Sequence, residues 1–403
     1  MVKKITILAT DFKPMLGGVA EYTFQLADKL NEKGILDQVL TSNIQNESYF
    51  FKVSAPQEFS WMKPFKEKSL VKRKFYSLAY ICQIKWMELR QVWDWLCHSQ
   101  KTFVIINWIV SPVSKRWISV LHFLHLQYAI ILHGKDIIVT CQNDTCWFAD
   151  ISSRAKLLIF NSQATATLFK TLQPCIKTPY YILYPGVDVN YLRQVILYSV
   201  EDLEQIFNCN FRGKLVISSV CRLVKRKGID LVIRSLEPIM KRNKNIIYII
   251  MGNGEEYQSL KDLIYSLKLD DQILLVGEFK DREKFSILNC SSIFIMPNNY
   301  QNGNDFEGFG ISFLEASYFK NVVIGGRNGG VTEAIKDGHS GFLVDTDSEY
   351  AVESIREVIS NLLENPTLMN QMSEFGHKYV VDNFQSTNTV DSFSQYIQDY
   401  LLL

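Results

Sequence analysis

Short runs of apolar residues alternate along this chain with longer segments that are apolar on one face only. The runs are rich in Val and Ile at successive positions, as strands of a parallel sheet covered by helices on both faces must be. We expect ten strands in two series: Ile5–Ala9, Thr102–Asn107, Ala129–Leu132, Leu157–Phe160 and Tyr181–Tyr184, then Leu215–Val220, Ile246–Met251, Ile273–Val276, Ile293–Met296 and Val322–Ile324. Helices are expected between many of them: Val19–Leu30, Ile229–Met240, Tyr257–Leu267 and Ala351–Leu363. This alternation predicts an α/β fold with parallel sheets.

Two such series indicate two sheets. A chain of 403 residues has room for two or three domains of about 150 residues each. The seam is expected near Pro185-Gly186, between the two series. We therefore expect one doubly wound, Rossmann-like domain over 1–187, a second over 188–377, and an amphipathic C-terminal segment over 378–403.

Composition excludes several classes of protein. Apolar residues make up 47% of the chain and charged residues 21%, which argues against disorder. The 43 Lys and Arg nearly balance the 42 Asp and Glu, so no overall field favours nucleic acid, and we expect no nucleic-acid partner. The eight cysteines form no C-x-x-C pair and no cluster with histidine, so we expect reduced thiols and no metal site.

Nothing in the sequence predicts passage into or across a membrane. The apolar part of the first ten residues is too short for the core of a secretory signal. No uncharged apolar stretch reaches the roughly 18 residues that a membrane-spanning helix needs. We expect a cytoplasmic protein, with attachment to a membrane only at its surface.

The segment from Phe306 to Ala316 contains two glutamates, Glu307 and Glu315, with glycines just after the first. A glycine-rich turn that opens a helix leaves free N–H groups, which suit a phosphate. Eight helical residues rise about 12 Å, so the two carboxylates could hold opposite parts of an extended ligand, such as sugar hydroxyls. The alternative is a surface glutamate plus a helix glutamate held in a pair, and spacing alone does not decide between the two interpretations.

A basic turn follows the expected strand Leu215–Val220, with four cations within six residues from Arg222 to Lys227. Open α/β sheets bind ligands at the carboxyl ends of their strands, so this turn suits a diphosphate. The alternative is a solvated basic turn.

Two weaker candidates lie in the first half. Gly17-Gly18 follows the first strand and precedes the first helix, where a ligand can approach the backbone, although a tight structural turn fits equally well. The pattern is not G-x-G-x-x-G, so a dinucleotide cofactor is not supported. His133 follows a strand and could donate a hydrogen bond to a substrate hydroxyl; the alternative is a packed structural histidine.

Taken in order, these pieces resemble the retaining glycosyltransferases of the GT-B fold, in family four. The resemblance extends over nearly the whole chain and is strongest from about Val216 to Leu343. It includes Pro185-Gly186-Val187-Asp188, similar to the family's interdomain motif, and Asn328-Gly329-Gly330 with Glu333. It implies two Rossmann-like domains facing across a cleft, with the last helix returning to the first domain.

The resemblance also implies roles. Glu307 and His133 would contact the transferred sugar as the catalytic residues. Arg222, Lys227 and Gly18 would hold the donor diphosphate. The remaining expected contacts are Glu315 at the donor ribose and Gly254 and Phe279 beside the base. No metal and no cofactor are expected, because cationic side chains replace the metal at the leaving diphosphate.

The resemblance therefore implies transfer of a sugar, with retention, from a nucleotide diphosphate sugar to a glycan or lipid-linked acceptor in cell-envelope glycan, polysaccharide or glycolipid synthesis. Alternatives are a GT-B nucleotide-sugar epimerase, which needs no acceptor, or a non-catalytic subunit that binds a nucleotide sugar. A phosphorylase is disfavoured, because no pyridoxal-type lysine motif is apparent.

The segment from Trp61 to Arg90 holds eight Lys or Arg, two acids and several aromatic residues. Such a basic, aromatic-rich segment suits an anionic membrane surface. The alternative is a helix whose aromatic residues pack into the first domain.

Overall fold

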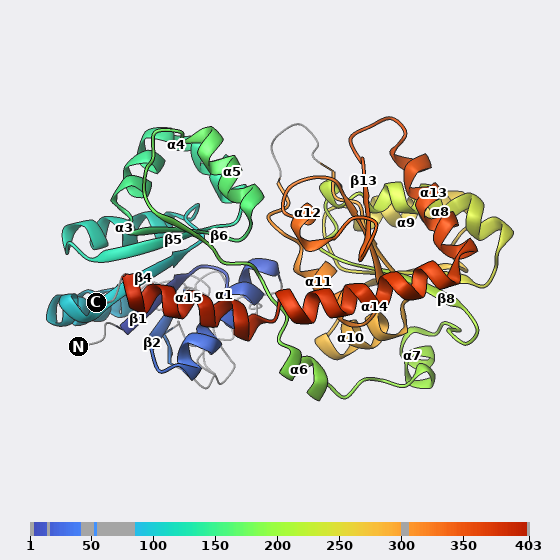
Figure 1. Ribbon diagram of the computed structural model, residues 1–403, viewed down its shortest axis with the longest axis horizontal. Coiled ribbons are helices and arrows are strands. Elements are labelled where there is room, and N and C mark those ends of the chain that lie inside the picture. Colours follow the sequence, from blue (N-terminus) through green and yellow to red (C-terminus); the bar gives the residue numbers. More distant parts are fainter. Residues whose placement is uncertain (1–3, 14–16, 42–51, 55–84, 300–305, 401–403) are drawn as a thin grey trace, which may run out of the picture. The chain divides into compact units, whose positions relative to one another are not determined.

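The computed structural model describes residues 4–13, 17–41, 52–54, 85–299 and 306–400 (Figure 1). The chain divides into two compact units. The first contains residues 1–184 and 387–403, and the second contains residues 185–386.

The first unit is built on a parallel sheet of seven strands in the order β3-β2-β1-β4-β5-β6-β7. The strands are β1 (Lys4–Ala9), β2 (Leu36–Thr41), β3 (Val53–Ser54), β4 (Thr102–Asn107), β5 (Gln127–Leu132), β6 (Leu157–Phe160) and β7 (Tyr180–Ile182). The helices are α1 (Gly18–Glu32), one over 85–98, α3 (Pro112–Phe123), α4 (Lys135–Arg154), α5 (Gln163–Leu172) and α15 (Ser386–Tyr400), with a 3₁₀ turn at Ser99–Lys101. From β1 the chain adds strands first toward one edge of the sheet and then, from β4 on, toward the other edge.

The second unit has a parallel sheet of six strands in the order β10-β9-β8-β11-β12-β13. They are β8 (Leu215–Val220), β9 (Ile246–Met251), β10 (Ile273–Gly277), β11 (Ile293–Met296), β12 (Val322–Gly326) and β13 (Gly341–Val344). The helices are α6 (Val189–Gln194), α7 (Val200–Phe207), α8 (Ile229–Arg242), α9 (Tyr257–Leu267), α10 (Asp281–Cys290), α11 (Ile311–Tyr318), α12 (Val331–Ala334), α13 (Ala351–Glu364) and α14 (Pro366–Asn383), with a 3₁₀ turn at Lys225–Lys227. Here the order reverses between β8 and β11.

Helices cover the sheet of the second unit on both faces. Alternate strand residues such as Ile217, Tyr248 and Ile295 form one buried core with the apolar faces of α8, α9 and α13. The other face carries α10, α11 and α14, which contact one another. Because both faces are covered, the strands are apolar at nearly every position, as the sequence analysis expected.

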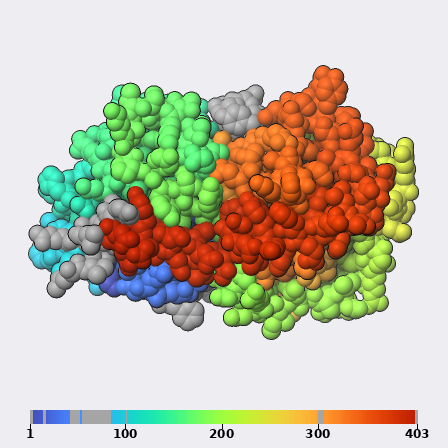
Figure 2. Space-filling model, in the orientation of Figure 1, coloured from blue at the N-terminus to red at the C-terminus, as the bar shows by residue number. Residues whose placement is uncertain are grey.

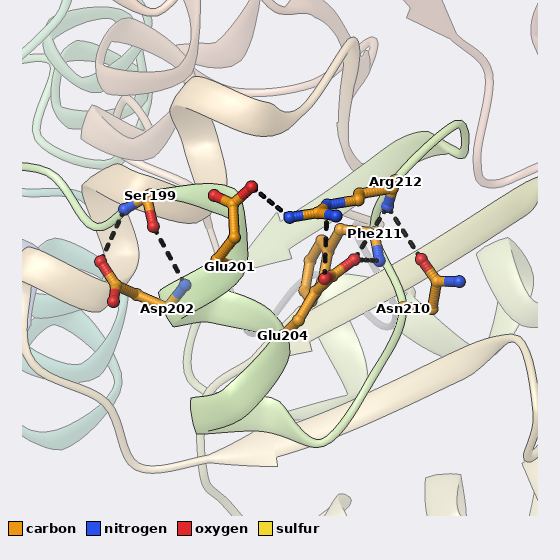
Figure 3. Close-up of polar contacts among 7 residues, drawn as sticks. All are labelled: Ser199, Glu201, Asp202, Glu204, Asn210, Phe211 and Arg212. Atoms are coloured by element: carbon orange, nitrogen blue, oxygen red, sulfur yellow. Dashed lines mark hydrogen bonds and ion pairs between the residues drawn. The ribbon is translucent and has the colours of Figure 1, made fainter.

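The segment that leads into β8 is held by side-chain caps around α7 (Figure 3). Ser199 and Asp202 form a reciprocal capping box at its N-terminus, with bonds of 3.1 and 3.0 Å. The Glu204 carboxylate accepts the backbone N–H groups of Phe211 and Arg212 at 2.9 and 3.1 Å. These bonds fix the turn immediately before the strand that carries the basic segment.

The last helix begins later in the chain than the expected boundary at residue 378. Residues 378–383 continue α14 in the second unit, and the last helix begins at Ser386. Thr387–Leu403 then belong to the first unit, where Phe393 and Tyr396 pack on Tyr181 with ring centroids 5.3 and 4.9 Å apart. Figure 2 shows this helix at the surface, in red. The implied return of the last helix to the first domain is therefore observed.

Two strands of the first unit were not predicted. β2 contains Asp37 and Gln38, which interrupt its apolar run. Gln38 is nevertheless buried, because its amide donates to Gln91 at 2.9 Å and its oxygen accepts from Ser54 at 2.8 Å. β3 has only two residues, too few for a periodic pattern.

Candidate functional site

The best-developed site lies in the second unit, at the carboxyl edge of its sheet, where β8 and β11 diverge. Open parallel sheets offer a crevice at this switch in strand order, because the chain leaves the two strands in opposite directions. The 3₁₀ turn Lys225–Lys227 follows β8. The segment containing Glu307 follows β11 and leads into α11.

One carboxylate oxygen of Glu307 accepts hydrogen bonds from three donors. Its Oε2 accepts from Lys227 Nζ at 2.7 Å, from Asn298 Nδ2 at 2.8 Å and from a guanidinium nitrogen of Arg226. Glu307 and Lys227 are largely buried. The other oxygen, Oε1, accepts no hydrogen bond from the described part of the chain.

The charge of Glu307 follows from these partners. Burial by itself raises the pKa of a carboxyl group, but the nearby cations Lys227 and Arg226 outweigh it and lower the pKa of Glu307 to about 2. Glu307 is therefore an anion at neutral pH, and it neutralises part of the basic turn.

The backbone around Glu307 is held by the glycine turn after β12. Gly330 N donates to the Glu307 carbonyl at 3.0 Å, and Asn328 Nδ2 donates to the Asn298 carbonyl at 2.5 Å. Gly329 has a φ of +52°, and a Cβ there would lie 2.3 Å from the Glu307 carbonyl oxygen. This motif, which forms part of the resemblance, supports the Glu307 loop in the structure.

Glu315, the second carboxylate of the pair, lies on α11 and accepts from Lys284 Nζ of α10 at 2.8 Å. Both side chains are only 12% exposed. The two glutamates thus have separate cations and do not form a pair with each other. The ion pair of the helix residue Glu315 agrees with the structural alternative raised from the sequence, whereas Glu307 is largely buried and is not a surface residue.

The loops after β8 and β9 lie backbone to backbone. Leu223 N donates to the Asn253 carbonyl at 2.9 Å, and Glu256 N donates to the Leu223 carbonyl at 3.0 Å. Gly254 has a φ of +158°, and a Cβ would lie 2.2 Å from the Leu223 carbonyl oxygen. Only glycine fits there.

Two other predicted residues flank these loops at the surface. Arg222 is exposed, and no partner for its guanidinium lies in the ranges that the structure describes. Phe279 follows β10 and is half-buried. The structure therefore brings Arg222, Lys227, Glu307 and Gly254 to loops along one edge of one sheet.

The first unit has its own cluster at the corresponding edge. Gly18 begins α1 just after β1, Asn107 ends β4, and His133 follows β5. The ring of His133 is bonded through Nε2 to Asn107 Oδ1 at 2.5 Å. Burial lowers the pKa of His133 to about 3, so the imidazole is neutral.

Asp136 anchors the turn that carries His133. Its carboxylate accepts the backbone N–H groups of His133, Gly134 and Ile137 at 2.9 to 3.1 Å. Burial raises the pKa of Asp136 to about 6, against the opposing effect of these bonds.

Three residues that shape these sites were not predicted from the sequence. Arg226 belongs to the basic run but was not singled out, and Asn298 and Asn107 were not considered as partners. Asn107 ends β4 and Asn298 closely follows β11, so a polar residue at the end of an apolar run could have indicated both, whereas Arg226 lies further on, within the basic turn after β8. Residues 300–305 of the approach to Glu307 lie outside the described residues.

Most of the segment 61–90, expected at a membrane surface, also lies outside the described residues. Its last six residues begin the helix over 85–98. That helix exposes four large apolar side chains at helical spacing: Trp86, Leu89, Trp93 and Leu96, which are 53–70% exposed. Arg90 lies over the ring of Trp86 at 5.5 Å.

In the described ranges, no three His, Cys, Asp or Glu side chains are grouped so that they could hold a metal ion. None of the described helices has the length and apolar character needed to cross a membrane.

Comparison with known proteins gives matches among the glycosyl transferases. Residues 203–379, within the second unit, match the family described as "Glycosyl transferases group 1". A relative from Mus musculus, alpha-1,3/1,6-mannosyltransferase ALG2, is 26% identical over 291 residues, which are 66% of this chain and 66% of that protein. The GDP-mannose-dependent alpha-(1-6)-phosphatidylinositol monomannoside mannosyltransferase of Mycolicibacterium smegmatis is 31% identical over 172 residues, 42% of this chain and 44% of that protein.

Solved structures show the same fold. Anabaena Alr3699/HepE, solved with UDP and glucose, superposes with a TM-score of 0.74 at 17% identity and covers 98% of this chain and 100% of its own. WaaG, a glycosyltransferase involved in lipopolysaccharide biosynthesis, gives a TM-score of 0.65 at 15% identity, covering 98% of this chain and 99% of its own. The predicted fold class, GT-B with two parallel Rossmann-like sheets, is confirmed.

The charge network around Glu307 predicts a pH-dependent contribution to stability. The pKa of Glu307 lies below its ordinary value of 4.5 in the folded protein, so its contribution is complete above about pH 4.5 and is lost as the pH falls toward about 2. Glu307→Gln should lower the free energy of unfolding by about 3 kcal/mol at pH 7, because it leaves buried cations unpaired. Urea unfolding at several pH values measures this difference, which should shrink below about pH 4.5.

Glu374→Gln is the matched control for that series. Glu374 pairs with Lys320 at 2.7 Å, but both side chains are more than half exposed. Its removal should change the free energy of unfolding by about 1 kcal/mol or less. If Glu307→Gln were equally mild at pH 7, the assigned network would be wrong.

Proposed function

Because residues 203–379 match the group 1 glycosyl transferases, we propose that this chain transfers a hexosyl group, with retention, from a nucleotide diphosphate sugar to an acceptor hydroxyl. The observation that carries the proposal is the meeting of a basic turn and an anionic Glu307 at the switch between β8 and β11. Such a site offers cations for a diphosphate next to a carboxylate for a sugar.

Arg222 and Lys227 bind the donor diphosphate in this proposal. Arg222 is exposed and has no partner in the described part of the chain, so it meets the phosphates without breaking a bond. Lys227 already bonds Glu307 and would be shared with the phosphate. A cation about 4 Å from a phosphate gains roughly 4 kcal/mol at an effective dielectric of 20, before desolvation.

Glu307 is proposed to contact the transferred sugar. Its Oε2 is saturated by three donors, whereas Oε1 accepts none from a described residue. A sugar hydroxyl can therefore donate to Oε1 while the cations hold the carboxylate in place. The same negative charge stabilises positive charge that develops at the sugar carbon during transfer.

The remaining donor contacts are also proposals. Glu315, held by Lys284, accepts from the ribose hydroxyls. Gly254 and Phe279 lie beside the base, where the loops after β8 and β9 run backbone to backbone. From the first unit, Gly18 and His133 contact the phosphates and the sugar.

In the proposed reaction the bond between the sugar carbon and the diphosphate oxygen breaks, and a bond from the acceptor oxygen to that carbon forms on the same face. The acceptor proton passes to the departing diphosphate. Cationic side chains stabilise the leaving group in place of a metal, and no cofactor takes part.

GDP-mannose is the first donor to test. Two relatives are named mannosyltransferases and one of them GDP-mannose-dependent, whereas structural neighbours were solved with UDP. The acceptor is proposed to be a glycan or lipid-linked glycan, because one relative is named for a phosphatidylinositol mannoside. We place the enzyme in the cytoplasm, at the inner face of a membrane.

Contact with anionic lipid is supported by the helix over 85–98. Its exposed Trp86, Leu89, Trp93 and Leu96 form one stripe, flanked by the half-exposed cations Lys85 and Arg116. Tryptophan and cations beside an apolar stripe suit the interface between headgroups and acyl chains.

Binding of the donor is tested first. We expect one nucleoside diphosphate among GDP, UDP and ADP, at 100 times its dissociation constant, to stabilise the protein by about 2.7 kcal/mol. The thermal melting temperature should rise by a few degrees. Arg222→Ala should abolish this shift, whereas Lys225→Ala, in the same turn but bonded to Asp230 at 2.8 Å, should keep it. Equal loss in both variants, or a shift that survives Arg222→Ala, would contradict the assignment.

Transfer itself is tested with the nucleotide sugar that binds, with and without acceptor. Glu307→Gln should lower kcat by about 100-fold or more, because a charge aimed at the reacting carbon is lost. Glu374→Gln should keep full activity. NMR of the product should show the anomeric configuration of the donor. Release of free sugar from donor alone, at the same rate as with acceptor, would favour the epimerase alternative; binding without any turnover would favour a non-catalytic subunit.

Lipid binding is tested by cosedimentation with vesicles. We expect binding to anionic vesicles to exceed binding to neutral ones. The double variant Trp86→Ser with Trp93→Ser should bind anionic vesicles about tenfold or more weakly, since each substitution removes a large apolar area that would be buried in the lipid. Tyr265→Ser, which removes an exposed aromatic ring of α9, is the control. Equal binding to neutral and anionic vesicles, or none, would end this part of the proposal.

A further inference from the structure

A short chain of hydrogen bonds runs through the first unit and ends on His133. Its members are Thr23 on α1, Asn107 at the end of β4 and His133 after β5, all of them buried. Asn107 Nδ2 donates to Thr23 Oγ1, and Asn107 Oδ1 lies 2.5 Å from His133 Nε2. Thr23 Oγ1 in turn donates to the Val19 carbonyl at 2.6 Å.

The Val19 carbonyl fixes the direction of this chain, because a carbonyl oxygen only accepts. The Thr23 hydroxyl has a single proton, which it donates to the Val19 carbonyl. Its oxygen must therefore accept a hydrogen bond from Asn107. The amide nitrogen of Asn107 therefore faces Thr23, and the amide oxygen faces His133. An amide oxygen needs a donor, so His133 must carry its proton on Nε2.

We propose that Asn107 is a positioning residue that holds His133 in the Nε2–H tautomer, so that His133 meets a substrate hydroxyl as a hydrogen-bond acceptor through Nδ1. In the described part of the chain nothing bonds Nδ1. This reverses the polarity expected from the sequence, in which His133 would donate. The identity of the hydroxyl as part of a sugar rests on the proposed function; the tautomer does not.

The surroundings of the ring favour the neutral state that this role needs. Tyr22 of α1 packs edge-on against the imidazole, with ring centroids 5.2 Å apart, and its hydroxyl donates to the Leu183 carbonyl. Burial raises the pKa of Tyr22, so it stays uncharged. The Asp136 carboxylate is directed to three backbone N–H groups, including that of His133.

The tautomer is measured directly in the uniformly ¹⁵N-labelled full chain, by long-range ¹H–¹⁵N correlation of the histidine rings. His133→Gln identifies the signals of this ring among the six histidines. We expect a protonated Nε2 and an unprotonated Nδ1. The opposite tautomer in the wild-type protein would overturn the proposal, since it would mean that the Asn107 amide is reversed.

A pair of variants at Thr23 tests whether the Thr23 hydroxyl fixes the tautomer of His133 by orienting the Asn107 amide. Thr23→Val keeps the shape but removes the oxygen that accepts from Asn107, so the amide can reverse and the ring should become a mixture of tautomers. Thr23→Ser keeps the hydroxyl and should retain the single tautomer. An unchanged ring in Thr23→Val would show that Asn107 does not fix the tautomer through Thr23.

Asn107→Asp tests the acceptor role with the donor and acceptor that support transfer. A carboxylate beside Nε2 stabilises the imidazolium, whose Nδ1–H cannot accept. We expect kcat/KM to fall by about tenfold below about pH 6 in this variant, with no such decrease in the wild type. A pH profile parallel to the wild type would overturn the acceptor role. If the wild type transfers no sugar, the proposed function fails, while the ring signals still decide the tautomer.

Discussion

The second unit is organised around one buried carboxylate. Glu307 holds Lys227, Arg226 and Asn298 on a single oxygen, and these partners come from the loops after β8 and β11. Lone buried cations would be costly, so the basic turn can lie at the sheet edge only because Glu307 compensates it. The glycine turn after β12 holds the backbone around this carboxylate. Gly330 N donates to the Glu307 carbonyl, and Asn328 Nδ2 donates to the Asn298 carbonyl.

The two units place polar groups at equivalent positions but with different chemistry. Both sheets reverse strand order once, and in both the polar side chains gather where the neighbouring strands diverge. The second unit uses ion pairs, which suit phosphates. The first uses a neutral chain of hydrogen bonds from Thr23 to His133, which suits hydroxyl groups.

Glycines at these edges serve packing between loops more than contact with a ligand. Gly254 allows the loop after β9 to lie on the backbone of Leu223, and Gly329 allows the turn after β12 to lie on Glu307. Both have positive φ values, where a side chain is strained. A glycine motif in the sequence therefore marks a loop that must approach something closely, but the partner can be another loop.

The two parallel sheets and most strand bounds follow from the sequence alone, because a strand covered on both faces must be apolar at nearly every position. It also indicated the basic turn and His133, since each directly follows such a run, and the two glutamates, since glycines come just after the first of them. The strand β2 was not predicted, because the polar Gln38 interrupts its apolar run. Gln38 is buried through hydrogen bonds with Gln91 and Ser54, which lie far from it along the chain. The pairing of each carboxylate with its cation, and the ring nitrogen of His133 that faces Asn107, depend on the folded arrangement. Those choices depend on distances between strands and loops remote in sequence, and spacing along the chain does not carry that information.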